Sequence, residues 1–271
     1  MGSGREAIHA GTWYEGTEQG LKKRMSKWIT AKEPSEGEAA FAVIVPHAGY
    51  IYSGEVAAVA YNSVKIPMTV LILNPNHRGI GAPLALYPEG AWETPLGDVP
   101  IDVELNHILL SNTSVVEDER AHIYEHSGEL QVPFLKYRRN DLKISVICIS
   151  SEELETMQQL GEGIAKSLKQ FNGEVLIVAS SDLTHYEPQK VAERKDRAVI
   201  ERIEALDPDG LWDTVERQRI SMCGVAPVTA TLFAARKSNV KSATLLSYKT
   251  SGDTTGDYSQ VVGYAAFLLK A

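Results

Sequence analysis

The chain has 271 residues, of which 44% are hydrophobic and 23% charged, the balance of an ordinary globular protein. Its 27 basic and 35 acidic residues give a net charge of −8, and no stretch combines dense Lys or Arg with aromatic residues. Because an acidic chain repels phosphate backbones, nucleic acid is disfavoured as the main partner. A small substrate fits this charge better.

Two cysteines, Cys148 and Cys223, are too few for a disulfide framework, although a single bridge between them is conceivable. No stretch approaches the roughly 20 apolar residues of a membrane span. The first six residues also lack the basic-then-apolar order of an export signal. These features predict a reduced, cytoplasmic protein that does not enter a membrane.

Short apolar runs alternate with longer amphipathic segments along the chain. In chain order, they predict a strand at 39–45, a helix at 54–64, a strand at 70–73, a helical stretch at 130–137, a strand at 144–149, a helix at about 152–170, a strand at 175–179, helices at 191–203, 211–218 and 225–235, and strands at 243–248 and 261–268. Strands alternating with helices predict an α/β protein, a three-layer sandwich around a central, mostly parallel or mixed sheet. No linker or repeat divides the chain, so residues 1–271 are expected to form a single domain.

Metal-capable side chains follow three of the predicted strands. His47 comes directly after the first, His77 after the second, and Asp182 and His185 after the strand at 175–179. Ligands of open α/β sheets bind beyond the carboxyl ends of the strands, so these groups are expected to meet at one edge. Each histidine alone could simply cap a strand end or bond to backbone. Together they predict a functional site.

The cysteines are expected to differ. Cys223 lies just before a predicted helix, whose dipole and amides favour the metal-binding thiolate form. Cys148 lies inside an apolar strand and is interpreted as a core thiol.

A further polar cluster spans residues 125–129 (EHSGE). In one interpretation Ser127 caps the helical stretch that follows. In the other, His126 or Glu129 faces the pocket, and the sequence leaves both open. His9 and His107 look incidental, with His107 in a solvated helix, and nothing requires His122 to join the site.

The ordered set of these segments resembles the Memo family, and more distantly the class III extradiol ring-cleaving dioxygenases, with which that family shares its fold. The matching pieces span nearly the whole chain: residues 5–14 (RE, then HAGTWY), 46–50 (PHAGY), 74–77 (NPNH), 94–97 (TPLG), 125–129 (EHSGE), 180–185 (SSDLTH) and 223–224 (CG). Gln131 departs from the better-known Memo pattern, in which a histidine often stands at this place.

The resemblance implies a role for each candidate residue. His47 and His77 match the two metal-binding histidines of the ring-cleaving enzymes, and Cys223 stands where those enzymes use a carboxylate. His185 matches their acid–base histidine, with Asp182 beside it to orient it or tune its basicity. Three further residues are candidates for lining the pocket: His126, Glu129 and Tyr50.

A divalent or redox metal is the implied cofactor. Fe(II) is favoured, with copper or zinc as alternatives, since a thiolate is softer than a carboxylate.

The leading hypothesis is a metal-dependent oxidoreductase acting on a small phenolic or aromatic substrate. The alternative is a non-catalytic module that binds metal or a peptide, because animal Memo proteins are linked to phosphotyrosine signalling and to iron or copper handling. Phosphotyrosine is less natural here, since no arginine cluster accompanies the motifs. A third, weaker hypothesis is metal-independent hydrolysis with Cys223 as nucleophile and His185 as base. Protein partners and self-association stay open.

Overall fold

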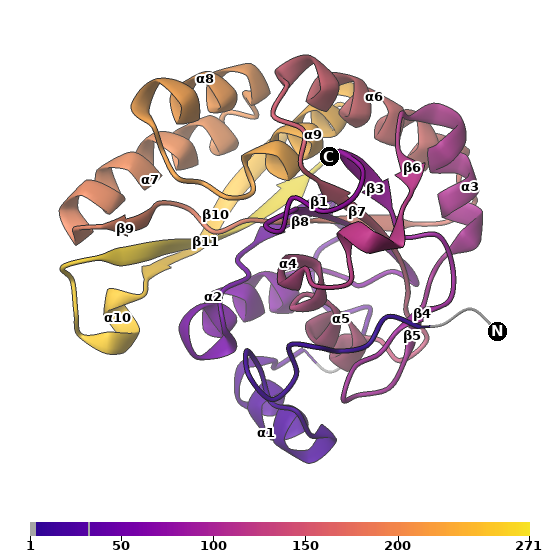
Figure 1. Cartoon of the computed structure of the whole chain (residues 1–271), viewed down its shortest axis with the longest axis horizontal. Helices are drawn as coiled ribbons and strands as arrows, with labels where there is room; N and C mark the ends of the chain where they lie inside the picture. The colour runs from indigo at the N-terminus through magenta and orange to yellow at the C-terminus, as the bar shows by residue number, and fades with distance from the viewer. Residues whose placement is uncertain (1–3, 32) are drawn as a thin grey trace.

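The computed structural model describes residues 4–31 and 33–271, so the first three residues of the amino-terminal stretch considered above lie outside it. Within the described residues, nine strands form one mixed sheet in the order β10-β11-β1-β8-β2-β7-β3-β6, with β9 added beside β11 (Figure 1). Its strands are β1 (Ala42–Val45), β2 (Thr69–Pro75), β3 (Leu84–Leu86), β6 (Val116–Glu117), β7 (Lys143–Ile149), β8 (Val175–Ser180), β9 (His185–Glu187), β10 (Ser242–Thr250) and β11 (Val261–Lys270).

The centre of the sheet consists of four parallel strands, β1, β8, β2 and β7. Helices provide the crossovers that parallel strands require: α2 (Tyr50–Ser63) joins β1 to β2, and α6 (Leu154–Gln170) joins β7 to β8. The strands are almost completely buried, which explains why their sequences are continuous apolar runs rather than alternating patterns. Parallel pairing places the carboxyl ends of all four strands side by side.

The strands outside this centre make the sheet mixed. β11 runs antiparallel to both β1 and β10, and β3 runs antiparallel to β7. A small separate hairpin pairs β4 (Ala91–Trp92) with β5 (Val99–Pro100).

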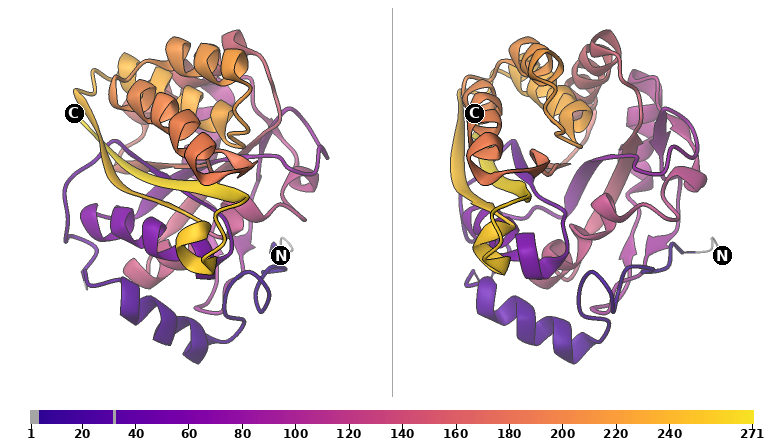
Figure 2. Two further views of the ribbon diagram at one scale, coloured as in Figure 1. Left: turned by 90° about the vertical axis from the view of Figure 1, so that its left-hand side faces the viewer. Right: turned by 60° about the vertical axis from the view of Figure 1, so that its left-hand side comes forward.

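Helices cover both faces of the sheet, giving three layers (Figures 1 and 2). On one face, α3 (Val103–Asn112), α6, α7 (Gln189–Glu204), α8 (Pro208–Gln218) and α9 (Val225–Lys237) enclose the larger apolar core. On the other, α1 (Glu18–Trp28), α2 and α5 (Val132–Arg138) enclose the second. The predicted α/β sandwich with a mostly parallel, mixed central sheet is confirmed.

The long predicted elements are present, with ends displaced by a few residues. Helix α2 begins at Tyr50 rather than at residue 54, and its N-cap is Gly49. The sequence interpretation did not name α1, the strands of two or three residues, or α10 (Gly252–Thr255). Such short strands carry too few residues for a periodic signal. No helix in residues 4–31 or 33–271 is both long and apolar enough to cross a membrane.

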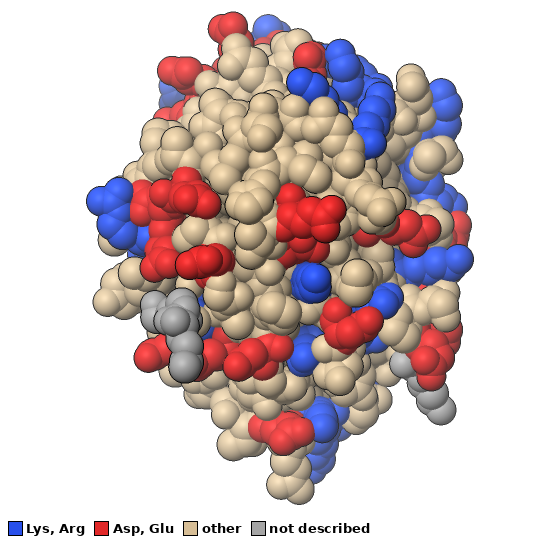
Figure 3. All heavy atoms as spheres, turned by 90° about the vertical axis from the view of Figure 1, so that its right-hand side faces the viewer, with Lys and Arg blue, Asp and Glu red and all other residues tan. Residues whose placement is uncertain are grey.

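Charged side chains of both signs share the face drawn in Figure 3, with acidic groups across its middle.

Candidate metal centre

Three histidines meet at the carboxyl edge of the parallel strands. His47 follows β1, His77 follows β2, and His126 begins the short helix α4 (His126–Glu129). One ring nitrogen of each lies within 4.8 Å of the others, a geometry that can hold a metal ion. The strand-end rule therefore found two members of this cluster. His126 was one of two open interpretations of the EHSGE motif.

The hydrogen bonds of His47 determine which of its ring nitrogens carries a proton. Its Nδ1 lies 2.8 Å from the Ser180 hydroxyl, which is itself 2.8 Å from the carbonyl oxygen of Ser127. A carbonyl only accepts, so Ser180 donates its proton there and accepts from His47 and from the Gln131 amide. Nδ1 of His47 therefore bears hydrogen, and Nε2 is the acceptor nitrogen, which lies 3.2 Å from the Cys223 sulfur.

Glu125 fixes His77 in the same way. The backbone N–H of His77 donates to one carboxylate oxygen of Glu125 at 2.6 Å, and Nδ1 lies 2.9 Å from the other. Burial alone would raise the pKa of Glu125, but the bond to His77 and the nearby His126 lower it below its usual range. An ionised carboxylate must accept, so Nδ1 of His77 carries the hydrogen of this bond and Nε2 is the ring nitrogen that the bond leaves for a metal. A carboxylate behind a histidine is the usual support of a metal ligand.

His126 shares this carboxylate and packs among aromatic rings. Its Nδ1 is 3.3 Å from Glu125, its ring stacks on His77 with centroids 4.5 Å apart, and Trp13 lies 4.3 Å away on centroids. Burial lowers the pKa of His126 to about 4, because the effect of Glu125 is opposed by His77 and His9. Burial also lowers the pKa of His47 well below its usual value, helped by His126 and His77. Both rings are therefore neutral at physiological pH, the form that binds metals.

Cys223 lies beside His47 but is not one of the three residues of the cluster. Its Sγ lies 3.2 Å from Nε2 of His47 and accepts a hydrogen bond from the backbone N–H of Asp182 at 3.2 Å. The sequence predicted a thiolate at Cys223, and the structure indicates a protonated thiol. Burial, together with the Asp182 carboxylate, raises the pKa of this thiol well above its usual value. These two effects outweigh the amino end of α9, which begins two residues later.

Asp182 and His185 occupy different positions. Asp182 is buried and accepts from the backbone N–H of His47 at 2.8 Å, so it fixes the backbone that carries the His47 ring. Burial raises the pKa of Asp182 to about 6. His185, on β9, is oriented by Ser221, whose carbonyl lies 2.8 Å from Nδ1. That carbonyl can only accept, so Nδ1 of His185 carries the hydrogen of this bond.

Glu129 and Tyr50 lie behind the site, in contacts that occupy their polar atoms. The Glu129 carboxylate binds the Arg5 guanidinium, the backbone N–H and Nδ1 of His9, and the hydroxyl of Tyr14, all at 2.8–3.0 Å. Tyr50 donates its hydroxyl to the carbonyl of Leu130 at 2.7 Å. His9, which looked incidental, is thus part of a buried network that connects sequence positions more than 100 residues apart.

The remaining polar residues singled out in the sequence lie outside the cluster of three histidines. Cys148 is fully buried, as a core thiol should be, and the two thiols are free. Glu125, not Ser127, caps α4 by accepting from the Ser127 N–H. His107 is exposed on α3. His122 is buried away from the cluster, with Nε2 3.1 Å from the carbonyl of Ala85.

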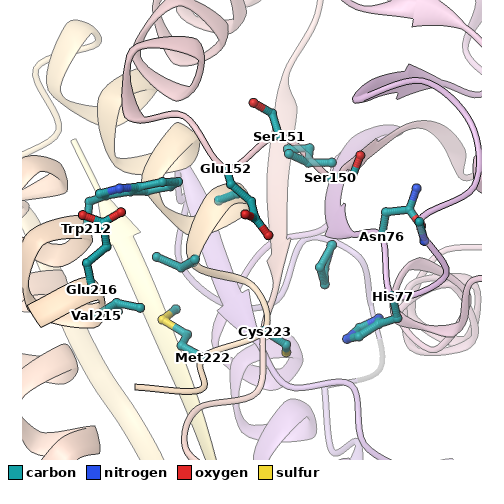
Figure 4. Close-up of a pocket in the computed structure, with 15 residues that line it drawn as sticks. Asn76, His77, Ser150, Ser151, Glu152, Trp212, Val215, Glu216, Met222 and Cys223 are labelled. Atoms are coloured by element: carbon teal, nitrogen blue, oxygen red, sulfur yellow. The ribbon is translucent and has the colours of Figure 1, made fainter. Parts of the chain in front are cut away.

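A cavity of about 600 Å³ opens beside the cluster (Figure 4). His77 and Cys223 point into it from one end, while Trp212 and Glu216 of α8 lie at the other. Its volume is within the range of small-molecule sites. The residues lining it are Pro75, Asn76, His77, Gly79, Ile149, Ser150, Ser151, Glu152, Trp212, Val215, Glu216, Met222, Cys223, Val225 and Ala226.

Fold and site together define an α/β sandwich protein with a histidine cluster at the carboxyl edge of its sheet. Comparison with known proteins identifies the family. The family model described as "Memo-like protein" matches residues 5–268. MEMO1 family proteins of Methanopyrus kandleri and Aquifex aeolicus are 42% and 41% identical, covering 98% and 97% of this chain and 99% and 98% of their own. The chain belongs to the Memo family.

A solved structure supports the fold at a greater distance. An uncharacterized protein from Escherichia coli K12 matches with a TM-score of 0.52 and 14% identity, over 83% of this chain and 98% of its own. Likeness at this level concerns architecture alone.

Proposed function

We propose that this protein is a metal-dependent oxidoreductase that binds one divalent or redox metal, Fe(II) in the first place and copper or zinc otherwise. His47, His77 and Cys223 are the proposed ligands, with His126 as a further nitrogen donor. The proposed substrate is a small phenolic or aromatic compound held in the adjoining cavity. The observation that carries the proposal is the convergence of three imidazoles, with one ring nitrogen of each within 4.8 Å of the others, beside a cavity of about 600 Å³.

The donor set fits such a metal. Nδ1 of His47 is bonded to Ser180 and Nδ1 of His77 to Glu125, so Nε2 is the proposed donor atom of each ring. Imidazole suits iron, copper and zinc, and a thiolate shifts the preference toward softer ions. Because the thiol of Cys223 is protonated in the free protein, its coordination would release a proton and make affinity rise with pH.

The chain's own groups supply binding and proton transfer. A bound metal would supply Lewis-acid and redox chemistry toward the substrate. Nε2 of His185, the ring nitrogen that is not bonded to the Ser221 carbonyl, is the proposed acceptor of a phenolic proton. Asp182 positions the backbone of His47, and the apolar lining of the cavity, including Met222 and Val225, would limit water around the bound ring.

Elemental analysis of protein purified without oxygen tests the metal, and oxygen uptake with a panel of phenols tests the reaction. We expect about one equivalent of metal that resists dialysis, and consumption of O₂ with at least one phenol. Metal-free protein that also fails to take up Fe(II), copper or zinc would refute the proposal.

A second candidate is a non-catalytic module that binds metal or a peptide. The observation that favours it is the position of His185, which is not among the described residues lining the cavity. Stoichiometric metal without oxygen uptake for any phenol would select this candidate.

A further inference from the structure

We propose that the cavity beside the histidine cluster selects aromatic ligands that carry a positively charged group, such as a protonated amine, over ligands that carry a carboxylate. This inference rests on the proposed function, because it concerns the substrate of the same site.

The charged side chains of the cavity wall have one sign. Apart from His77 and Cys223, the ionisable side chains among the described lining residues are Glu152, just before α6, and Glu216, on α8. Both glutamates are exposed, and no ion pair or hydrogen bond of either carboxylate is found in the described part of the chain. Two ionised carboxylates at the wall of a cleft attract cations and repel anions.

No lysine or arginine is among the described lining residues of the cavity. Arg78 follows His77 directly, but its Nε donates to the carbonyl of Tyr124 at 3.1 Å, and Arg78 is not part of the cavity wall. The chain as a whole carries a net charge of −8, which adds to the repulsion of anions.

The remaining lining explains why the ligand should also be aromatic. Trp212 and Glu216 lie side by side at the end of the cavity opposite His77, and Glu152 projects between the two ends (Figure 4). Met222, Val215 and Val225 provide apolar surface along the wall. A ring can therefore lie against apolar side chains with its phenolic oxygen toward the histidines and its charged substituent toward the glutamates.

Three probes of similar size and different charge test the inference: tyramine, 4-ethylphenol and 4-hydroxyphenylacetate. Calorimetric titration of the protein as isolated, with its metal content measured, is expected to rank them in that order at 20 mM salt. An exposed charge pair contributes about two- to fivefold in affinity, so tyramine should lose about tenfold in the double variant Glu152→Gln/Glu216→Gln. Binding of 4-ethylphenol should change less than twofold.

Glu89→Gln is the matched control, because Glu89 is exposed and is not a lining residue of the cavity. It should leave all three affinities unchanged, and 0.5 M salt should reduce the preference of the wild-type protein.

The outcomes separate this inference from the proposed function. Equal tyramine binding by wild type and double variant, with metal content retained in both, would overturn the charge preference and leave the metal centre standing. Loss of metal from the double variant would overturn it too, since the glutamates would then serve the metal rather than the ligand. A protein that takes up no metal refutes the proposed function, whatever the ranking of the probes.

Discussion

Two polar clusters adjoin each other at α4, with the rings of His9 and His126 5.9 Å apart on centroids, and the clusters differ in how their polar atoms are bonded. In the cluster of Arg5, His9, Tyr14 and Glu129, the carboxylate accepts from four donors, and the charges neutralise each other. In the cluster of His47, His77 and His126, protein oxygens bind Nδ1 of His47 and of His77, while Nε2 of these rings is left to the side of the cavity and Cys223. The first arrangement stabilises the fold, whereas the second keeps lone pairs available for a ligand. Burial of histidine alone does not distinguish them.

The largest expected effect is on stability, in the first cluster. Glu129→Gln leaves the buried Arg5 guanidinium without its counter-charge, which should lower the free energy of unfolding by about 3 kcal/mol. His9, Arg5 and Tyr14 lower the pKa of Glu129 although burial alone would raise it, so the folded pKa is below the unfolded one. The stabilisation is therefore complete above the unfolded pKa of about 4.3 and is lost as the pH falls through the folded pKa.

Denaturant unfolding between pH 3 and pH 7 measures this effect. Wild type should lose more stability in acid than Glu129→Gln does. Glu6→Gln, at an exposed position one residue from Arg5, is the control and should change little. Equal stability of the two variants would show that the network contributes nothing.

The next effect is on metal affinity, in the second cluster. His47→Ala removes a donor nitrogen, and we expect the affinity for Zn²⁺, used as a probe, to fall by more than about 100-fold. His107→Ala changes an exposed histidine of α3 and should leave Zn²⁺ affinity unaltered. Competition with a chromophoric chelator measures both. Unchanged affinity in His47→Ala would remove the cluster as a metal centre.

A smaller loss of Zn²⁺ affinity is expected when Glu125, which supports the histidines, is changed. Glu125→Gln keeps the shape of the residue but removes the charge that holds His77 and His126, so Zn²⁺ affinity should drop about 10- to 100-fold. Gln can also present its amide to Nδ1 and favour the wrong tautomer of His77. If affinity stays within twofold, the carboxylate acts only as the cap of α4.

The smallest effects separate the two cysteines. Cys223→Ser should lower Zn²⁺ affinity about tenfold with little change in thermal midpoint, because a serine hydroxyl is a poor ligand for a borderline-soft metal. Cys148→Ser should instead lower the free energy of unfolding by about 1–3 kcal/mol, through a buried hydroxyl, with metal per folded protein unchanged. The reverse pattern would mean that the wrong cysteine was assigned to the metal.

The sequence predicted the features that depend on local pattern. The buried runs that became β1, β2, β7 and β8 predicted a parallel sheet, and the strand-end rule brought His47 and His77 together. Contacts between residues far apart in the chain could not be predicted from local pattern. The bond from His9 to Glu129 joins residues 120 positions apart, so His9 looked incidental. The dipole of α9 suggested a thiolate at Cys223, but burial and Asp182, which only the packed structure reveals, reverse that expectation.

The pairing of His47 with Cys223 brings together residues 176 positions apart in the chain. An ion held by both, and by His77 and His126, would act as a cross-link between the first strand, the second strand, α4 and the start of α9. Such a link restricts the unfolded chain much as a disulfide does, and binding to the folded state alone adds about 2.7 kcal/mol at a free metal concentration 100 times the dissociation constant. Heat resistance of this protein would then depend on metal supply, and a chelator would expose the carboxyl edge of the sheet to proteases first.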